Sequence, residues 1–264
     1  MQRIRQSSPY IFFSVVFALF VMEVQVRFGS KRMGYVWAII DPMTKVIIFA
    51  AIKVVLMNMD IPGLDFPVFL AISFFWYEFF RRVIISSMNV FKANKTLYNY
   101  KRVFPVDVLI ATLLLEFMVT LLSLMVFLGI LYYLEMDISI KDFPMVFVSV
   151  MWLGVFTFAI GLFSAMINSF YKNYEKFITF LFTPLMFASG LFYALDFIPA
   201  RFEMVKEYLL YNPLVHFMEM LHGNYFRVLD TAYVDYDYML FWTIVPLFVG
   251  LFLYRRSEKK IVNL

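Results

Sequence analysis

Residues 25–42 read QVRFGSKRMGYVWAIIDP, a basic stretch that runs directly into an apolar one. Arg27, Lys31 and Arg32 precede Gly34, and the side chains that follow are mostly apolar up to residue 57. Positive charge beside the first spanning helix usually stays in the cytoplasm, because it is not carried across the bilayer. We therefore expect a membrane span at residues 34–57 that begins on the cytoplasmic side, and its orientation sets that of every later span.

Motifs for chemistry within the chain are missing from the sequence. Gly29 and Gly34 have the glycine spacing of a phosphate-binding P-loop, but Tyr35 and Val36 follow where that motif needs Lys and then Ser or Thr. The chain has no cysteine, no His/Glu set with zincin spacing and no Gly-x-Ser-x-Gly elbow. We expect no catalytic residue, no metal site and no cofactor in this chain.

The composition is that of an integral membrane protein. The chain has 264 residues, of which 63% are hydrophobic and 21% aromatic, and a water-soluble domain of this size could not cover so much apolar surface. A formal charge of +4 could suggest nucleic-acid binding. The basic residues lie between the apolar runs instead, as the positive-inside bias predicts, so we expect no nucleic-acid partner.

Six apolar runs approach the roughly 20 residues that a spanning helix needs. They are residues 34–57, 66–90, 106–134, 144–167, 177–195 and 238–254. The prediction is an all-α integral membrane protein with a single membrane domain over residues 1–264. It comprises a cytoplasmic interfacial segment at residues 1–33, a bundle of six transmembrane helices at residues 34–254 and a cytoplasmic tail at residues 255–264.

Two further apolar pieces are too short to span. Residues 10–22 follow the helix start Ser8-Pro9 and are interpreted as an amphipathic helix in the inner-leaflet interface, with a cleaved signal peptide as the alternative. Between the last two spans, Pro199 opens and Asn212-Pro213 interrupts an apolar stretch that Gly223 is expected to stop. Two short outer helices within residues 198–223 are predicted, either re-entrant or capping the bundle.

The distribution of Lys and Arg agrees with an even number of spans and two cytoplasmic termini. Connections on the predicted inner side hold most of these residues. The outer connections hold only Lys141, Arg201, Lys206 and Arg227. We therefore predict a multi-pass membrane protein with both termini in the cytoplasm.

Ionisable side chains at membrane depth cost about 2.5–3.5 kcal/mol each on insertion scales and are candidates for function. At about 1.5 Å per residue from Gly34, Lys45 lies roughly 16 Å into the first span, and Lys53 lies near its outer end. Asp41 and Lys45 are four residues apart and can pair along one helix face.

The second span carries a similar cluster, in which Glu78 can reach both Arg81 and Arg82 at i+3 and i+4 spacing. Our hypothesis is that Lys45, Arg81 and Arg82 help line a passage for an anionic ligand, since Arg suits bidentate phosphate binding. The alternatives are snorkelling to the interface and structural pairing within the helices.

Aromatic side chains could stack on the rings of a ligand in such a passage. Tyr35, Trp37, Trp76, Tyr77 and Tyr193 are the candidates, although Tyr and Trp also form ordinary interfacial belts. For each single residue the belt or core interpretation is favoured.

Three polar side chains of the outer segment recur at every third position. His216, Glu219 and His222 could gather on one helix face, but this is not the HExxH spacing of a zinc site. A structural or gating role is favoured over a metal site. Glu116 is the only charged residue within the third span beyond its first turn, and the sequence does not decide whether it faces a dimer partner or the passage.

Several short motifs carry a family likeness. They are Arg27-Phe28-Gly29, Gly34-Tyr35-x-Trp37, Asp41-Pro42, Asn212-Pro213-Leu-Val-His216 and Tyr225-Phe226. In this order, over nearly the whole chain, they resemble the permease subunit of capsular-polysaccharide ABC exporters of the KpsM type, akin to O-antigen and teichoic-acid export permeases. Asp41 stands where much of that family has Glu before the proline, which keeps the charge and shortens its reach.

The resemblance implies a homodimer that works with two copies of a separate ATPase, which binds ATP and Mg. The permease and its ATPase would export a lipid-linked polysaccharide across the inner membrane of a Gram-negative bacterium, with a periplasmic co-polymerase-like partner and an outer-membrane export protein. The anionic ligand of Lys45, Arg81 and Arg82 would then be this glycan or its phosphate-bearing lipid. By the same resemblance, residues 91–105 form a coupling segment seated on the ATPase. Its candidate contacts are Lys92, Asn94, Lys95, Tyr98, Lys101 and Arg102. The interfacial helix would touch the ATPase and form a lateral gate.

Two other classes of function remain open on the residues alone. A membrane-embedded glycan or acyl transferase could use His216 or an outer carboxylate as base, and it would be active without a partner. A secondary transporter or channel would favour internal repeats, and no convincing repeat relates the two halves. Binding of an ATPase separates the exporter from both.

Overall fold

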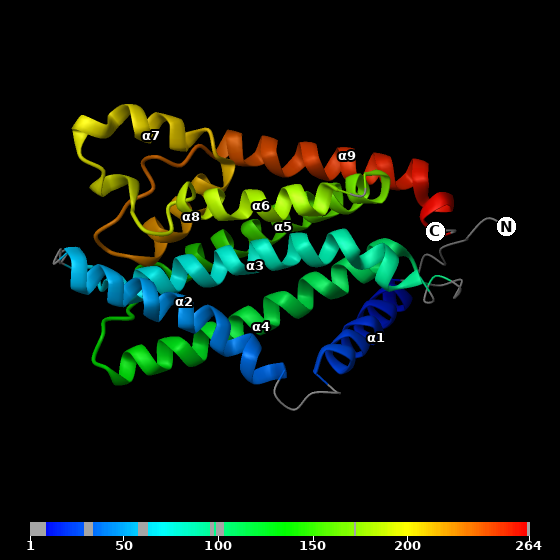
Figure 1. Ribbon diagram of the computed structural model, residues 1–264, viewed down its shortest axis with the longest axis horizontal. Helices are drawn as coiled ribbons and strands as arrows, with labels where there is room; N and C mark the ends of the chain where they lie inside the picture. Colours follow the sequence, from blue (N-terminus) through cyan, green and yellow to red (C-terminus); the bar gives the residue numbers. More distant parts are fainter. Residues whose placement is uncertain are drawn as a thin grey trace.

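The computed structural model describes residues 9–28, 34–57, 63–95, 98, 103–171 and 173–262. These ranges are largely helical and contain no β-strand, so the all-α prediction is confirmed. The long helices are α1 (Pro9–Phe28), α2 (Gly34–Met57), α3 (Phe66–Ala93), α4 (Pro105–Tyr133), α5 (Phe143–Phe170), α6 (Tyr174–Phe187) and α9 (Tyr236–Val262). Most of them run along the long axis of the molecule, and the start of α1 lies at the same end as the end of α9 (Figure 1).

Helix α3 forms the centre of the bundle. Every side chain from residue 68 to residue 80 is buried, among them Phe69, Phe74, Phe75 and Phe79. A helix that is apolar on all sides is stable only when it is covered on all sides. Here α4 and α5 pack along it most extensively, and α2 and α6 complete the enclosure.

Four of the described helices are long and apolar enough to cross a membrane, namely α1, α4, α5 and α9. Helices α2 and α3 have 24 and 28 residues, which corresponds to about 36 Å and 42 Å, but they carry charged side chains within these lengths. Helices α2 and α3 match the spans predicted at residues 34–57 and 66–90 within a few residues. The molecule is thus a multi-helix membrane protein built as one bundle.

The fifth predicted span is shorter than expected. It was predicted to reach residue 195, but α6 ends at Phe187 and covers about 21 Å. Gly190 adopts a left-handed conformation with φ of 76°, which turns the chain away from the helix axis. Asn212 donates through Nδ2 to the carbonyl oxygen of Ala188 at 2.9 Å and so satisfies the helix end.

The first helix is longer than the apolar run that predicted it. Helix α1 continues past Met22 to Phe28 because polar residues of its last turns find partners, Arg27 with Glu116 among them. Its length and composition therefore suffice for a span, contrary to the prediction. Leu19 is buried while Phe17 on the other side is exposed, so the first part of α1 is apolar on both sides rather than amphipathic. It lies obliquely beside α4 (Figure 1).

The two short outer helices are present as α7 (Glu203–Leu210) and α8 (Pro213–Tyr225), preceded by the 3-10 turns η2 (Leu195–Phe197) and η3 (Ala200–Phe202). Helix α7 has no buried side chain, whereas nearly all side chains of α8 are buried. Gly223 does not stop α8, which runs on to Tyr225. Its glycine is required because the backbone of Asp230 passes directly against it.

Replacing Gly223 with Ala is expected to destabilise the protein by about 1–3 kcal/mol, the cost of overpacking a filled site. An added Cβ would lie 2.3 Å from the backbone oxygen of Asp230, which has no flexible side chain to move aside. The melting temperature of the detergent-purified protein measures this. Gly154→Ala on α5 is the matched control, since nothing lies within 4 Å of its added Cβ. Equal melting temperatures for the two variants would contradict the close approach.

Candidate functional site

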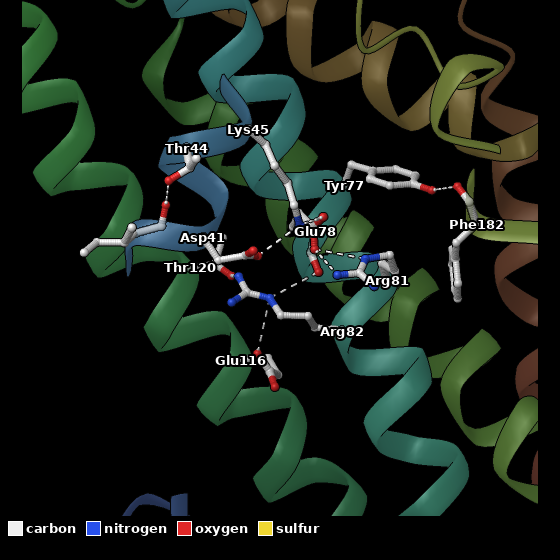
Figure 2. Close-up of polar contacts among 11 residues, drawn as sticks. Asp41, Thr44, Lys45, Tyr77, Glu78, Arg81, Arg82, Glu116, Thr120 and Phe182 are labelled. Carbon is white, nitrogen blue, oxygen red and sulfur yellow. Dashed lines mark hydrogen bonds and ion pairs between the residues drawn. The ribbon is translucent and has the colours of Figure 1, made fainter. Parts of the chain in front are cut away.

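A chain of ion pairs joins α2 to α3 inside the bundle. Lys45 on α2 donates to Asp41 at 2.9 Å and to Glu78 on α3 at 2.8 Å. Arg81 donates to the second oxygen of Glu78 through Nη2 at 2.7 Å and through Nε at 3.0 Å. The pairs predicted at i+4 between Asp41 and Lys45 and at i+3 between Glu78 and Arg81 are both present (Figure 2).

Contrary to the prediction, Arg82 does not pair with the Glu78 carboxylate. Its Nε lies 3.4 Å from the backbone oxygen of Glu78, and its guanidinium points to α4, where Nη2 is 3.2 Å from Thr120 and Nε is 3.7 Å from Glu116 (Figure 2). Arg81 and Arg82 are about 100° apart around the helix. Arg81 therefore pairs with the Glu78 carboxylate, whereas Arg82 is directed to the second carboxylate, that of Glu116 on α4. Glu116 also binds Arg27 from α1.

The two central carboxylates are deeply buried and doubly paired. The side chain of Glu78 is 4% exposed and that of Glu116 is 0% exposed. A buried charge is tolerated only when it is paired and hydrogen-bonded, and each of these carboxylates is shared by two cations. The network thus connects the four consecutive helices α1, α2, α3 and α4.

One edge of the network remains accessible. The side chains of Lys45 and Arg81 are 32% and 29% exposed, and that of Asp41 is 58% exposed, whereas Arg82 is 14% exposed. An anion at this edge could accept hydrogen bonds from Lys45 and Arg81 without breaking the buried ion pairs of Glu116. This edge, defined by Asp41, Lys45 and Arg81, is called the accessible edge below.

The predicted aromatic candidates divide into buried and undescribed side chains. Trp76 packs against Phe79 and Phe117, and Tyr77 donates to the backbone oxygen of Phe182; both are buried. Neither ring offers a free face within this chain. The side chains of Tyr35, Trp37 and Lys53 lie outside the described residues. Tyr193 is half-buried and donates to the backbone oxygen of Phe187 at 3.1 Å.

The predicted coupling segment continues from the end of α3. Asn94 caps that end through its backbone N–H to Val90, Lys95 is exposed, and Tyr98 is buried with its hydroxyl 3.3 Å from the Val90 oxygen. Tyr98 therefore anchors the segment to α3. The side chain of Lys92 and residues Lys101 and Arg102 lie outside the described residues.

The polar residues of α8 contact four other segments of the chain. His216 accepts from the backbone N–H of Asp235 through Nδ1 at 3.1 Å, so its Nε2 carries the proton that is donated to the Leu210 oxygen at 2.8 Å. Glu219 accepts from the Leu195 N–H at 3.2 Å. His222 lies 2.8 Å from Ser73 of α3. The described residues bring no three metal-ligating side chains together, and this geometry supports the structural interpretation of α8.

Burial makes Glu219 a pH-sensitive residue. Burial raises its pKa to about 8, whereas burial lowers the pKa of His222 to about 3. A raised carboxyl pKa means that the folded state holds a proton that the unfolded state has released. The stabilising contribution is complete below the unfolded pKa near 4.5 and is lost as the pH rises to about 8.

Glu219→Gln is expected to flatten this pH dependence, because an uncharged amide oxygen still accepts from Leu195. Wild type should lose stability relative to the variant by about 1.4 kcal/mol per pH unit between those limits. Melting temperatures from pH 5 to pH 9 measure the difference, in which the effect of His222 cancels. Glu207→Gln on the exposed α7 serves as control. Parallel curves for wild type and Glu219→Gln would contradict the raised pKa.

Sequence reasoning missed two anchoring roles. Arg27 and Glu116 are 89 positions apart, so no helical spacing could join them. Asn212 was singled out only as part of an Asn-Pro break and of a family motif, yet its side chain binds the end of α6 and caps α8 by accepting from Leu214 at 3.1 Å. The only signal for that second role is that Asn is a preferred cap before a Pro at the first helical position.

The chain matches the family model described as ABC-2 type transporter over residues 14–226, which contain the ion-pair network and α8. The chain belongs to the ABC-2 type transporter family. This ABC-2 chain is 31% identical to the polysialic acid transport protein KpsM of Escherichia coli, over 93% of its own length and 94% of the relative's.

Other relatives extend the same grouping. The chain is 25% identical to the capsule polysaccharide export inner-membrane protein CtrC of Neisseria meningitidis, over 93% of this chain and 91% of that protein. It is 24% identical to the O-antigen export system permease protein RfbA of Klebsiella pneumoniae, over 92% of this chain and 91% of that protein. The resemblance stated from the motifs is thereby confirmed.

Proposed function

We propose that this ABC-2 chain is the permease subunit of an ATP-driven exporter that moves capsular polysaccharide across a bacterial inner membrane. The observation that carries the proposal is the similarity to KpsM and CtrC over more than nine-tenths of the chain. These two proteins are named for polysialic acid transport and capsule polysaccharide export. Export of O-antigen is the second candidate, favoured by the similarity to RfbA.

The proposed topology has six spans, α2, α3, α4, α5, α6 and α9, with both termini cytoplasmic. Two features support it. The start of α1 and the end of α9 lie at one end of the bundle, while α7 and most of α8 lie towards the other (Figure 1). The short α6 is continued by turns that rest on α8, so the outer helices would complete the barrier as re-entrant elements. Helix α1 is long enough to span, but it lies obliquely beside α4 rather than along the bundle axis, so its proposed place is the inner interface.

The chain contributes no hydrolytic chemistry in this proposal. Two permease copies would bind two ATPase copies, which hold ATP and Mg and act on residues 91–105. Tyr98 fixes this segment to α3, so force applied there reaches the central helix of each bundle. The periplasmic and outer-membrane export partners would receive the polymer beyond α7 and α8.

The accessible edge is the proposed contact for an anionic, lipid-linked polysaccharide. Lys45 and Arg81 can donate to a phosphate or carboxylate there, and Asp41 and Glu78 hold the two cations in place until it arrives. Arg82 would contribute indirectly, through its ion pair with Glu116. Lys53, Tyr35 and Trp37 remain candidate contacts, whereas the buried Trp76 and Tyr77 are assigned to packing.

Affinity purification in mild detergent tests the class of function. The expected result is recovery of an equimolar ATP-binding subunit whose hydrolysis is tied to glycan at the cell surface. Transferase activity of the isolated chain, with no such subunit, would contradict the proposal. Expression with its ATPase in an Escherichia coli strain that lacks KpsM, and separately in a strain that lacks its O-antigen permease, distinguishes the two substrate classes by which surface polymer returns.

A further inference from the structure

Helix α6 lies at the periphery of the bundle. Phe182 is its only buried side chain, while Phe177, Phe180 and Phe187 are more than half exposed. A helix with so little buried surface is positioned by few contacts, so each polar contact along it matters more.

Two side chains fasten α6 to α3. At the inner end, Nδ2 of Asn89 donates to Oε1 of Glu175 at 2.7 Å. About halfway along α6, the hydroxyl of Tyr77 donates to the backbone oxygen of Phe182. Further contacts link α6 to α5, where Ser164 and Tyr174 lie 3.4 Å apart, and to α8 through Asn212.

The α3 end of this link is braced by α5. Nδ2 of the buried Asn168 donates to the backbone oxygen of Met88 at 2.8 Å, one residue before Asn89. Gly161 lets α5 approach closely, since an added Cβ would lie 2.9 Å from Oγ of Ser87. Asn89 is therefore positioned beside Glu175 by a helix that is packed tightly against α5.

Helix α3 is mechanically continuous between the coupling segment and this link. It runs from Phe66 to Ala93 and contains neither Gly nor Pro after Pro67, the residues at which helices bend or break. Asn89 lies two residues before Phe91, where the segment proposed to receive the ATPase begins. A displacement of that segment along the axis of α3 must move Asn89 with it.

We propose that α3 transmits movement of the coupling segment to α6, and that Asn89 and Glu175 are the positioning residues of this transmission. The inference rests on the proposed function, because it requires an ATPase that acts on residues 91–105. The Tyr77 contact carries the same movement farther along α6. Export then depends on the hydrogen bond between two side chains, while ATP hydrolysis by the partner does not.

Four variants distinguish the effect of the hydrogen bond between Asn89 and Glu175 from the effect of either residue alone. Glu175→Gln keeps an oxygen that accepts from Asn89, and Glu175→Ala removes it. Asn89→Asp places two carboxylates against each other, which repel. Asn89→Asp combined with Glu175→Gln restores the bond with donor and acceptor exchanged. The double variant and Asn89→Asp differ at one residue and form the matched pair.

The measurements are ATP hydrolysis and polymer export by the complete permease–ATPase complex in vesicles. Glu175→Ala and Asn89→Asp should lower the polymer exported per ATP hydrolysed by about tenfold or more, a typical size for coupling between sites. Glu175→Gln and the exchanged pair should restore that ratio to near the wild-type value. A purely structural role would lower hydrolysis and export together and leave the ratio unchanged.

The outcomes separate this inference from the proposed function. If the wild-type complex does not export in an ATP-dependent way, the proposed function itself fails. If wild type exports and Glu175→Ala exports with the same ratio, only the transmission inference is overturned. If Glu175→Ala does not fold, the matched pair decides, and equal export ratios for Asn89→Asp and the double variant overturn the inference.

Discussion

Glu116→Ala is expected to destabilise the protein by about 3–5 kcal/mol, the cost of removing one partner from a buried ion pair. The Glu116 side chain is 0% exposed and is shared by Arg27 and Arg82. Without it, the guanidinium of Arg82 keeps a hydrogen bond to Thr120 but has no carboxylate beside it. Arg27 is 36% exposed and can turn towards water, so the penalty falls mainly on Arg82.

A second substitution shows where the penalty arises. Arg82→Met in the Glu116→Ala background removes the unpaired charge and is expected to restore part of the lost stability, although each change alone is destabilising. Melting temperatures of wild type, the two single variants and the double variant in detergent form a double-mutant cycle, which measures the interaction between Glu116 and Arg82. Strictly additive effects would mean that Glu116 and Arg82 do not interact.

Lys45→Met combined with Arg82→Met is expected to abolish export while assembly with the ATPase persists. The pair removes one cation from the accessible edge and one of the two cations that neutralise Glu116 behind it. The fold should survive because Glu78 keeps Arg81 and Glu116 keeps Arg27. Surface polysaccharide on intact cells measures export, and copurification of the ATPase measures assembly.

A charge-preserving double variant serves as the matched control. Lys45→Arg with Arg82→Lys keeps both positive charges at the same positions and should retain most of the export. If cells carrying the two methionines display normal surface polysaccharide, the passage hypothesis for these residues is wrong. If the charge-preserving variant also fails, the geometry of the pairs matters rather than the charge that an anion would meet.

The membrane class, the family and most helix positions could be predicted from the amino-acid sequence alone. Transfer of an apolar helix into the bilayer depends on the residues of that helix alone, so each long run could be recognised separately. Pairs within one helix were accessible for the same reason, because the spacing of Asp41 and Lys45, or of Glu78 and Arg81, places the side chains on one face. The motifs around Arg27 and Asn212 identified the family correctly.

Which helices share ion pairs depends on how the helices pack in three dimensions. Glu116 receives Arg82 and Arg27 because α1, α3 and α4 pack together, and no spacing along one chain segment encodes that arrangement. The burial of Trp76 and Tyr77, the early end of α6 and the close approach at Gly223 have the same origin. Each depends on which faces of separate helices meet, and packing between helices is set by the complementary shape of many side chains at once.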